Sequence, residues 1–218
     1  MVKFLKNDPC CILTSQWKND DDFLKDRAEK VDVTIPSKLG GYPVTSIGDS
    51  AFRNCNSLSS ITIPNNVAII QSNVFRSCYS LSSVTISNSV TIIQNSAFGY
   101  CYSLPSITIP NSVTDIISSA FSSCYSLSSV TVPNNVAIIQ GSTFYYCYSI
   151  KNYILNCTSV PTLSDKNAFD SINKSAIIWV KDDLVESYKS ATNWSEYATY
   201  IKPISSMPQK LKEELGVL

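Results

Sequence analysis

The sequence contains no histidine. Histidine is the side chain that most often acts as a general acid or base near neutral pH, and it is also the commonest protein ligand for zinc. Serine and cysteine are plentiful, but without a histidine to activate them a nucleophile would need an unusual lysine or carboxylate base. The composition therefore weighs against many enzyme classes, and we predict that the protein is not an enzyme.

Net charge and long apolar runs are lacking too. The 17 Lys and Arg residues balance the 17 Asp and Glu residues, so no global basic field attracts nucleic acid or an anionic membrane. No apolar run reaches the roughly eighteen residues that a transmembrane helix needs. Met1 to Cys11 carry charge where a secretory signal peptide needs an unbroken apolar run. We predict no nucleic-acid partner, no membrane insertion and no signal peptide.

Motifs for cofactors and metals are also missing. The sequence has no phosphate-binding loop, no dinucleotide-binding fingerprint and no nucleophile elbow of the G-x-S-x-G type. The acidic run at residues 20–22 lacks the glycine and the spaced ligands of a calcium-binding loop. We therefore predict no cofactor and no metal site.

What the sequence does contain is an internal repeat of 23 residues. A phenylalanine, a cysteine three positions later and a leucine or isoleucine three positions after that recur in phase. The repeated residues are Phe52, Phe75, Phe98, Phe121 and Phe144; Cys55, Cys78, Cys101, Cys124 and Cys147; and Leu58, Leu81, Leu104, Leu127 and Ile150. A fixed period of this length is typical of a solenoid, in which each unit buries its apolar side only against its neighbours.

Each unit contains the L-x-x-L-x-L pattern of a leucine-rich repeat, which predicts one short strand per coil and a return through a turn and a short helical or 3-10 segment. Period-two alternation points Ile61 and Ile63 inward, and Ser60 and Thr62 outward. The same pattern recurs at Val84/Ile86, Ile107/Ile109 and Val130/Val132, with Val33/Ile35 before it and Tyr153/Leu155 and residues 177–180 after it. The pattern predicts about seven parallel strands stacked at roughly 4.8 Å.

Helix-start signals accompany the repeat and its C-terminal end. A polar residue that suits the N-cap of a short helical turn precedes each phenylalanine: Asp49 or Ser50, Ser72, Asn95 or Ser96, Ser118 or Ser119, and Ser142. Farther along, the segment from Asp183 to Glu186 suits a capping box that opens a helix. Trp194 and Tyr197 follow and are bulky enough to cover the last coil.

The domain organisation follows from the need to cap both ends of a solenoid. Residues 1–30 are charged and include Trp17 and Phe23, which suits an N-terminal capping or linker segment. Residues 31–176 are predicted to be the solenoid, and residues 177–218 a C-terminal strand–helix cap and tail.

The unit Gly40–Phe52, GGYPVTSIGDSAF, and the unit Leu104–Val113, LPSITIPNSV, resemble BspA-type leucine-rich repeats. Residues 177–194 resemble the C-terminal cap of that family, and the resemblance spans roughly residues 31–203. It implies a leucine-rich-repeat solenoid, mostly β with helical caps. It also implies a surface-exposed or secreted protein, without known enzymatic activity, that adheres to host or matrix proteins or to other cells.

The repeated cysteines form the cysteine ladder: Cys55, Cys78, Cys101, Cys124 and Cys147. Successive coils bring their α-carbons to about 5 Å, which is within disulfide range, so a disulfide or a metal site is one interpretation. In-register side chains, however, point the same way rather than at one another, and unpaired cysteine is among the most buried residue types. We predict buried free thiols.

A tyrosine follows the cysteine in four successive coils. We call Tyr79, Tyr102, Tyr125 and Tyr148 the tyrosine ladder, and Asn56 occupies the same position in the coil before it. An amphipathic aromatic is favoured where a wet surface meets a partner, so the ladder is a candidate binding surface for protein or glycan. The alternative is that neighbouring rings stack on each other and only stiffen the solenoid.

The outward positions of the strands form a regular array of hydroxyls. The serine row is Ser60, Ser83, Ser106 and Ser129, and the threonine row is Thr62, Thr85, Thr108 and Thr131. Solenoids usually bind through a strand face, although Ser and Thr are also ordinary strand residues in such a repeat. Between Asn54 and Ile150 only Arg76 and Asp115 are charged, so recognition by the central coils must depend on hydroxyls, amides and aromatics.

Two functions are compatible with these observations. The first is a non-enzymatic recognition or adhesion protein that binds a protein or carbohydrate ligand through a solenoid face at a cell surface. The second is an intracellular protein-interaction scaffold. The resemblance favours the first, whereas the missing signal peptide and reduced cysteines favour the second.

Overall fold

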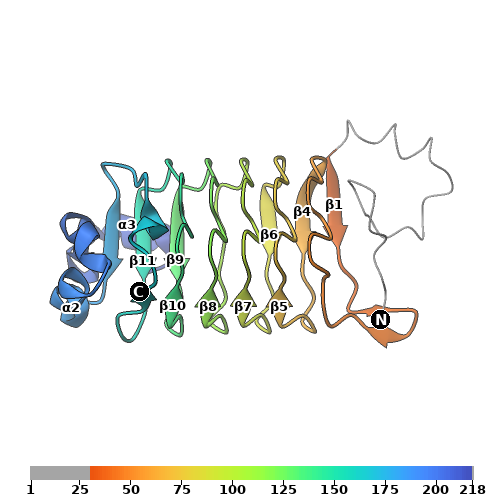
Figure 1. The fold of residues 1–218 in the computed structure, drawn as a ribbon, viewed down its shortest axis with the longest axis horizontal. Coiled ribbons are helices and arrows are strands. Elements are labelled where there is room, and N and C mark those ends of the chain that lie inside the picture. The colour runs from red at the N-terminus through yellow and green to blue at the C-terminus, as the bar shows by residue number, and fades with distance from the viewer. Residues whose placement is uncertain (1–29, 218) are drawn as a thin grey trace.

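The computed structural model describes residues 30–217 and places them in one elongated stack of coils, with β1 near one end and α2 at the other (Figure 1). The N-terminal segment predicted over residues 1–30, apart from Lys30, and the acidic run at 20–22 lie outside the described residues. Within the part of the chain that is described, no helix has both the length and the apolar character that crossing a membrane requires.

The strands of the L-x-x-L-x-L units form one side of this stack. A three-stranded parallel sheet contains β1 (Val31–Thr34), β4 (Leu58–Thr62) and β6 (Ser83–Thr85). A four-stranded parallel sheet contains β9 (Ser129–Val132), β11 (Asn152–Leu155), β13 (Ile177–Val180) and β14 (Ile201–Pro203). The predicted stack of parallel strands is confirmed, with β14 as a strand that the repeat pattern did not predict.

The two sheets are separated at the coil that contains Pro105. Here the amide of Ser82 donates to the carbonyl of Ser59 at 2.8 Å, and the amide of Ser128 donates to the carbonyl of Pro105 at 3.0 Å. Pro105 has no N–H and cannot donate to Ser82 in the same way. This coil consequently contributes an isolated bridge, from Thr108 to Thr131, in place of a full strand.

A second parallel sheet lines another side of the stack. It contains β5 (Ile69–Ile70), β7 (Ile92–Ile93), β8 (Asp115–Ile116), β10 (Ile138–Ile139) and β12 (Thr162–Leu163). In each of these the second residue is buried and the first is half-buried or exposed. The prediction of one strand per coil was therefore wrong, because two residues are too few for alternation to indicate a strand.

The segment around each phenylalanine is a run of turns, and the predicted short helix in each of these coils was wrong. Ser119 and Ser123 have φ angles of 60° and 60°, and Ser50, Asn73, Ser96 and Ser142 are also left-handed. Alternate backbone amides therefore donate to carbonyls of the next coil and not within their own coil. Phe98 donates to the carbonyl of Ala120 at 2.8 Å, and Tyr100 donates to the carbonyl of Ser122 at 2.7 Å. A residue in the left-handed region interrupts a helix, so the candidates Ser50, Ser96, Ser119 and Ser142 are not N-caps, and Ser72 is followed directly by the left-handed Asn73.

The core is a stack of buried rings. Phe52, Phe75, Phe98, Phe121, Phe144 and Phe169 are at most 1% exposed, and neighbouring ring centroids lie 5.2 to 5.7 Å apart with the rings stacked. The repeated Leu58, Leu81, Leu104, Leu127 and Ile150 are buried beside them. Since each ring contacts the equivalent ring one coil away, the core extends continuously from the first coil to the C-terminal cap.

The first coil accommodates its extra residues in an antiparallel hairpin. β2 (Lys38–Leu39) pairs with β3 (Tyr42–Pro43), and Gly40 and Gly41 form the two-residue turn with φ angles of 57° and 84°. A turn with two left-handed residues strongly prefers glycine, which explains the Gly-Gly pair at this point.

The C-terminal cap is built from short helices: η2 (Lys166–Phe169), η3 (Asp182–Leu184), α2 (Val185–Ser190), η4 (Trp194–Tyr200), η5 (Ile204–Ser206) and α3 (Gln209–Leu215). Trp194 and Tyr197 are buried over the last coil, as predicted. The indole of Trp194 donates to the carbonyl of Pro161 at 2.8 Å, and the Tyr197 hydroxyl donates to the carbonyl of Lys166.

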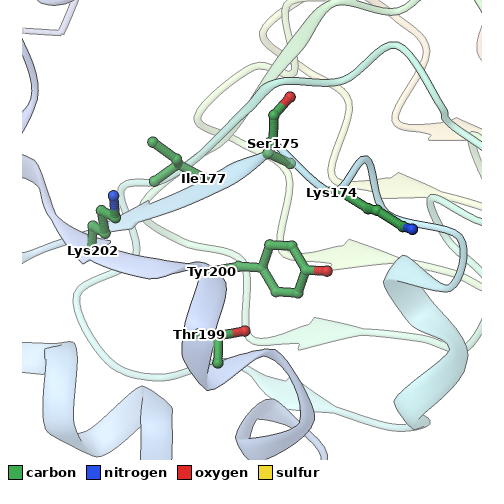
Figure 2. Close-up of a pocket in the computed structure, with 7 residues that line it drawn as sticks. Lys174, Ser175, Ile177, Thr199, Tyr200 and Lys202 are labelled. Carbon is green, nitrogen blue, oxygen red and sulfur yellow. The ribbon is translucent and has the colours of Figure 1, made fainter.

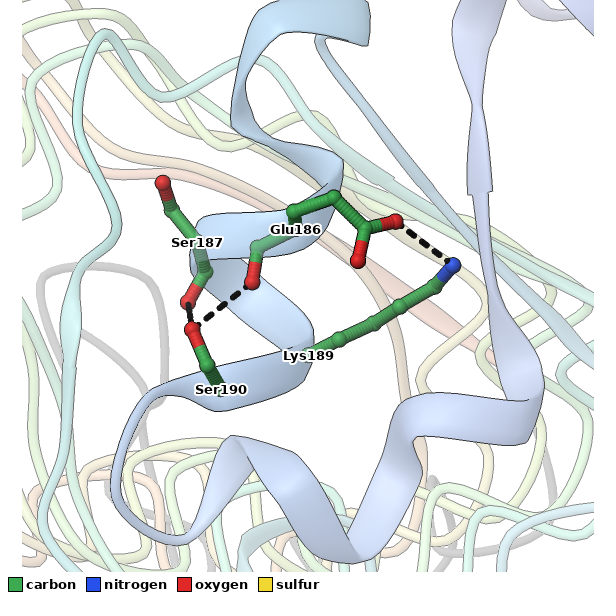
Figure 3. Close-up of polar contacts among 4 residues, drawn as sticks. All are labelled: Glu186, Ser187, Lys189 and Ser190. Atoms are coloured by element: carbon green, nitrogen blue, oxygen red, sulfur yellow. Dashed lines mark hydrogen bonds and ion pairs between the residues drawn. The ribbon is translucent and has the colours of Figure 1, made fainter.

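The predicted capping box at Asp183–Glu186 was wrong. The 3-10 turn η3 runs directly into α2, so Asp183 lies inside a helical turn and no side chain caps α2. Glu186 instead forms an ion pair with Lys189, with Oε1 and Nζ 3.0 Å apart, and Ser190 Oγ donates to the carbonyl of Glu186 at 2.8 Å (Figure 3).

Helix α3 folds back over the outward face of the four-stranded sheet, in front of β11 in Figure 1. Ile154 of β11 and Trp179 of β13 point outward, yet they are buried with Met207 and Val217 in a second apolar cluster. Leu211 and Leu215 of α3 pack against this cluster. The C-terminal tail therefore closes the last part of the sheet face, while the outward side chains of the central coils stay open to solvent.

Two neighbouring serines should respond in opposite ways to replacement by glycine. Ser119→Gly is expected to raise the free energy of unfolding by about 0.5 to 1 kcal/mol, since glycine adopts the left-handed conformation without the Cβ penalty. Ser118→Gly is the matched control: it removes the bond from Ser118 Oγ to the carbonyl of Gly141 at 2.8 Å and should lower stability by about 1 kcal/mol. Urea unfolding of both variants measures this, and a Ser119→Gly variant less stable than the parent would contradict it.

Candidate functional site

The tyrosine ladder forms a continuous row of stacked rings across four coils. The ring centroids of Tyr79 and Tyr102 lie 4.8 Å apart, those of Tyr102 and Tyr125 lie 4.6 Å apart, and those of Tyr125 and Tyr148 lie 5.7 Å apart. Tyr79, Tyr125 and Tyr148 are 41%, 38% and 49% exposed, and Tyr102 is half-buried. The stack that was considered as an alternative to a binding role is thus present, and a large part of each ring is also accessible to a partner.

Stacking determines which part of each ring a partner can reach. Tyr102 has Tyr79 on one face and Tyr125 on the other, so its edge and hydroxyl are what remain for contact. Burial, and next the neighbouring Tyr125 and Tyr79, raise the pKa of Tyr102 above its ordinary value. A tyrosine hydroxyl is protonated at physiological pH even at its ordinary pKa, so this hydroxyl can donate a hydrogen bond there.

Further aromatic residues widen the ladder beyond the sequence prediction. Tyr100 contacts Tyr102 edge-on at 6.2 Å, and the guanidinium of Arg76 lies 5.2 Å from the centroid of the Tyr100 ring. Tyr146 stacks on Tyr148 at 5.4 Å, and Tyr145 stacks on Tyr146 at 3.9 Å. Tyr100 and Tyr146 share the position before the repeated cysteine, but the other coils have Asn54, Ser77 and Ser123 there, so the 23-residue pattern did not indicate an aromatic row.

The serine row and the threonine row lie in register on the outward face of the strands. Ser60 pairs with Ser83 and Thr62 pairs with Thr85, while Thr108 is bridged to Thr131. Ser83, Thr85, Ser106 and Thr108 are exposed, whereas Ser60, Thr62, Ser129 and Thr131 are half-buried. The structure therefore presents all eight hydroxyl side chains on one face, most openly in the middle of the stack.

The serine row begins at an aspartate. Ser59 Oγ and Ser60 Oγ both donate to Asp32 Oδ1 at 2.6 Å. These two hydrogen bonds lower the pKa of Asp32 below its ordinary value. Ser60 is consequently engaged within the protein, and the hydroxyls from Ser83 to Ser106 are the more available part of the row.

The two rows end differently at the C-terminal side. In the threonine row Thr131 is followed in register by Ile154 and Trp179, which α3 covers. In the serine row Ser129 is followed by Asn152 and Ile177. The indole of Trp179 donates to Asn152 Oδ1 at 2.9 Å, which leaves the NH2 group of Asn152 to donate elsewhere.

A hollow of about 370 Å³ lies where β13 and β14 begin (Figure 2). We call it the lysine hollow, and it is lined by Lys174, Ser175, Ala176, Ile177, Thr199, Tyr200 and Lys202. Figure 2 shows the Tyr200 ring between the two lysines. The repeat pattern did not indicate this site, because these residues belong to the irregular C-terminal coils.

The cysteine ladder is buried, as predicted. Cys101, Cys124 and Cys147 are free thiols, and each Sγ donates to the carbonyl of a phenylalanine in a preceding coil at 3.1 to 3.3 Å. Burial is the main cause that raises the pKa of Cys101 and of Cys124 well above the ordinary value, and that raises the pKa of Cys147 to about 12. Buried thiols held neutral in this way lack the thiolate form that acts as a nucleophile or a metal ligand. Within the described residues, no cluster of Cys, Asp and Glu could hold a metal ion.

Comparison with known proteins gives a family match over the repeats. Residues 31–151 match the model of the BspA type leucine rich repeat region, in six copies. No curated protein matches the chain.

Solved structures of bacterial leucine-rich repeat proteins are similar to the chain. The T. pallidum leucine rich repeat protein TpLRR is 32% identical over 58% of this chain and 59% of its own, with a TM-score of 0.57. A leucine rich cell surface protein from Faecalibacterium prausnitzii is 32% identical over 69% of this chain and 48% of its own, with a TM-score of 0.55. The pneumococcal vaccine antigen PcpA is 15% identical over 80% of this chain and 40% of its own, with a TM-score of 0.64, and shares the fold. The chain therefore spans 40% to 59% of the length of these proteins.

The buried thiols should make stability depend on alkaline pH. Above about pH 8.5 thiols of the unfolded chain lose protons, while the folded chain keeps its thiols neutral up to about pH 12 at Cys147. Stability present below pH 8.5 is then lost as pH rises, by up to about 1.4 kcal/mol per pH unit for each thiol. Urea unfolding between pH 8 and pH 11 measures this slope. The variant Cys101→Ala/Cys124→Ala/Cys147→Ala should have a shallower slope, and equal slopes would contradict the assignment.

Proposed function

The chain belongs to the BspA-type leucine-rich repeat family, and from this premise we propose that it is a non-enzymatic recognition protein. Its ligand is a protein or a glycan. The binding surface consists of the tyrosine ladder with the serine row and the threonine row. The family match supports an interaction or adhesion role, and both this role and the choice of surface are our proposal.

The unbroken tyrosine ladder is the observation that carries this proposal. Tyrosine is enriched at protein interfaces because it offers a large contact area and a hydrogen-bonding tip with few rotatable bonds. Here each ring is held by its neighbours at 4.6 to 5.7 Å, so little side-chain entropy remains to be lost on binding. The four rings are also more exposed than core packing requires, at 38% to 49% for three of them.

The similar structures support a location at the cell surface. The protein from Faecalibacterium prausnitzii is described as a leucine rich cell surface protein, and it is 32% identical to this chain. The absence of histidine from the whole sequence favours recognition over acid–base chemistry.

An intracellular interaction scaffold is the second candidate, and the buried free cysteines favour it. Cys101, Cys124, Cys147 and Cys157 are free thiols, and thiols persist most readily in a reducing compartment. Complete burial also protects a thiol from oxidation, so the same residues are compatible with an extracellular protein.

Labelling of intact source cells with a membrane-impermeant amine reagent separates the two locations. We expect the protein to be labelled on intact cells, through exposed lysines such as Lys38 and Lys174. A known cytoplasmic protein serves as the control for cell integrity. Labelling only after cell lysis would contradict the surface role and favour the scaffold.

The tyrosine ladder should be required for binding and far less for folding. We expect the variant Tyr79→Ser/Tyr102→Ser/Tyr125→Ser/Tyr148→Ser to lose about 30-fold or more in affinity for ligands found on arrays of matrix proteins and glycans, the loss typical of one interface hot spot. Its free energy of unfolding should fall by no more than about 3 kcal/mol, because each of the three stacked pairs contributes about 0.2 to 1 kcal/mol.

The matched control replaces the same four tyrosines by phenylalanine, which keeps the stacked rings and removes only the hydroxyls. This control should be as stable as the parent, so any loss of affinity can be assigned to the missing hydroxyls alone. A serine variant that unfolds yet a phenylalanine variant that binds normally would indicate a structural ladder. Failure of the parent protein to bind any arrayed protein or glycan would contradict the proposed function.

A further inference from the structure

The tyrosine ladder and the serine row converge on the lysine hollow. The Asn173 side chain donates to the carbonyl of Tyr148 at 2.8 Å, which fixes the turn before β13 to the backbone of the last ladder residue. Lys174 and Ser175 of this turn line the hollow. The serine row reaches the same place through Asn152 and Ile177, and Ile177 is itself a lining residue. A ligand that follows either row toward the C-terminal end therefore arrives at the hollow.

The turn that carries Lys174 is rigid. Asn173 Oδ1 accepts hydrogen bonds from the amide of Ser175 at 2.9 Å and from Ser175 Oγ at 2.8 Å. The amide of Ala176 also donates to the carbonyl of Asn173 at 2.8 Å, so with the bond from Asn173 to Tyr148 four hydrogen bonds hold this turn. These bonds set the backbone position of Lys174 relative to Tyr148, while its exposed side chain is free to turn toward a ligand.

The hollow is positively charged, in contrast to the central coils. Lys174 and Lys202 line it, and its lining includes neither Asp nor Glu. The ion pairs of the described residues join Lys189 to Glu186 and Lys210 to Glu214, so neither lining lysine is neutralised by a carboxylate. Lys151 is exposed, and its carbonyl accepts the amide of Ile177 at 2.9 Å, which places its backbone beside the hollow.

The whole surface is rich in hydrogen-bond donors. It offers two ammonium groups, the NH2 group of Asn152, serine and threonine hydroxyls, and the tyrosine hydroxyls. The exposed edges of the stacked tyrosines carry the positive part of the ring quadrupole. These groups match an acceptor-rich, negatively charged ligand.

The geometry of the rings favours polypeptide over sugar. A sugar ring needs an open aromatic face to pack on, but Tyr102 and Tyr125 each have both faces covered by neighbouring rings. Edges and hydroxyls instead suit the backbone carbonyls and carboxylates of an extended peptide.

We infer that the lysine hollow is the anchor of the binding surface and takes the carboxylates of an acidic polypeptide segment whose chain lies along the tyrosine ladder. This inference rests on the proposed function and specifies its partner. The only charged residues of the central coils are Arg76 and Asp115. The two lysines that line the hollow are therefore the groups that select the ligand by charge.

A fluorescent decamer of glutamate is the probe that tests this, with a decamer of glutamine as its neutral counterpart. The full chain should bind the glutamate decamer, should bind the glutamine decamer about tenfold or more weakly, and should lose affinity for the former as salt rises from about 50 to 200 mM. The variant Lys174→Gln/Lys202→Gln should lose about tenfold in affinity for the glutamate decamer, as two charge-assisted contacts are removed.

The matched control is Lys30→Gln/Lys38→Gln, which removes the same charge from exposed positions at the opposite end of the solenoid. Its affinity should stay within about twofold of the parent. If both variants lost the same affinity for the glutamate decamer, net charge alone would explain the effect and the inference would be overturned. Equal affinity for the two decamers would overturn it as well. A sulfated glycan that binds more tightly than the glutamate decamer, and depends on the same two lysines, would overturn the polypeptide assignment.

The result also separates this inference from the proposed function. If the array ligands depend on the tyrosine ladder but not on Lys174 and Lys202, the inference fails and the recognition role stands. If the glutamate decamer binds through the two lysines while the serine variant of the ladder binds it normally, the hollow acts without the ladder and the inference is likewise overturned.

Discussion

The structure depends on one constraint, namely that each coil donates backbone hydrogen bonds to the coil beside it along three separate sides. Two of these sides are the parallel sheets, and the third is the run of turns around each phenylalanine, where alternate amides such as that of Phe98 bond to the next coil. A solenoid unit cannot bury its apolar side alone, so these bonds and the stacked core form together. A repeat of 23 residues keeps all three sides in phase, and the extra residues of the first coil are looped out in the β2–β3 hairpin, so that β1 and β4 still pair in register.

The same register produces every ladder in the molecule. A side chain at a given phase meets its equivalent one coil away, as the phenylalanines do in the core at 5.2 to 5.7 Å and the tyrosines do at the surface at 4.6 to 5.7 Å. The cysteines are placed by the same rule, but their thiols turn to phenylalanine carbonyls and not to each other. Identical spacing therefore gives a core, a set of buried thiols and an exposed aromatic row, and the difference lies only in which side of the coil each phase faces.

Departures from the repeat give the molecule its asymmetry. Pro105 interrupts one sheet because it lacks an N–H, and the Gly40–Gly41 turn lets the first coil carry a hairpin. At the other end the irregular coils form a lysine-lined hollow in the turn that is bonded to the backbone of Tyr148, and α3 closes the neighbouring part of the sheet face. The regular coils thus supply an extended, nearly uncharged surface, and the irregular end supplies two lysines. A charged residue at a repeated position would instead recur in every coil.

The sequence by itself determined the solenoid, the parallel strands, the burial of the phenylalanines and cysteines and the alignment of the tyrosines and hydroxyls, because each of these follows from a residue type recurring at a constant phase. Only the tertiary structure decided the second sheet, whose two-residue strands are too short to show alternation, and the turns that replace the expected helices, whose amides bond between coils and not within one. It also decided that α3 covers Ile154 and Trp179 and that Lys174 and Lys202, 28 positions apart, line one hollow. Those contacts join segments that share no repeated phase, so no periodicity in the chain could indicate them.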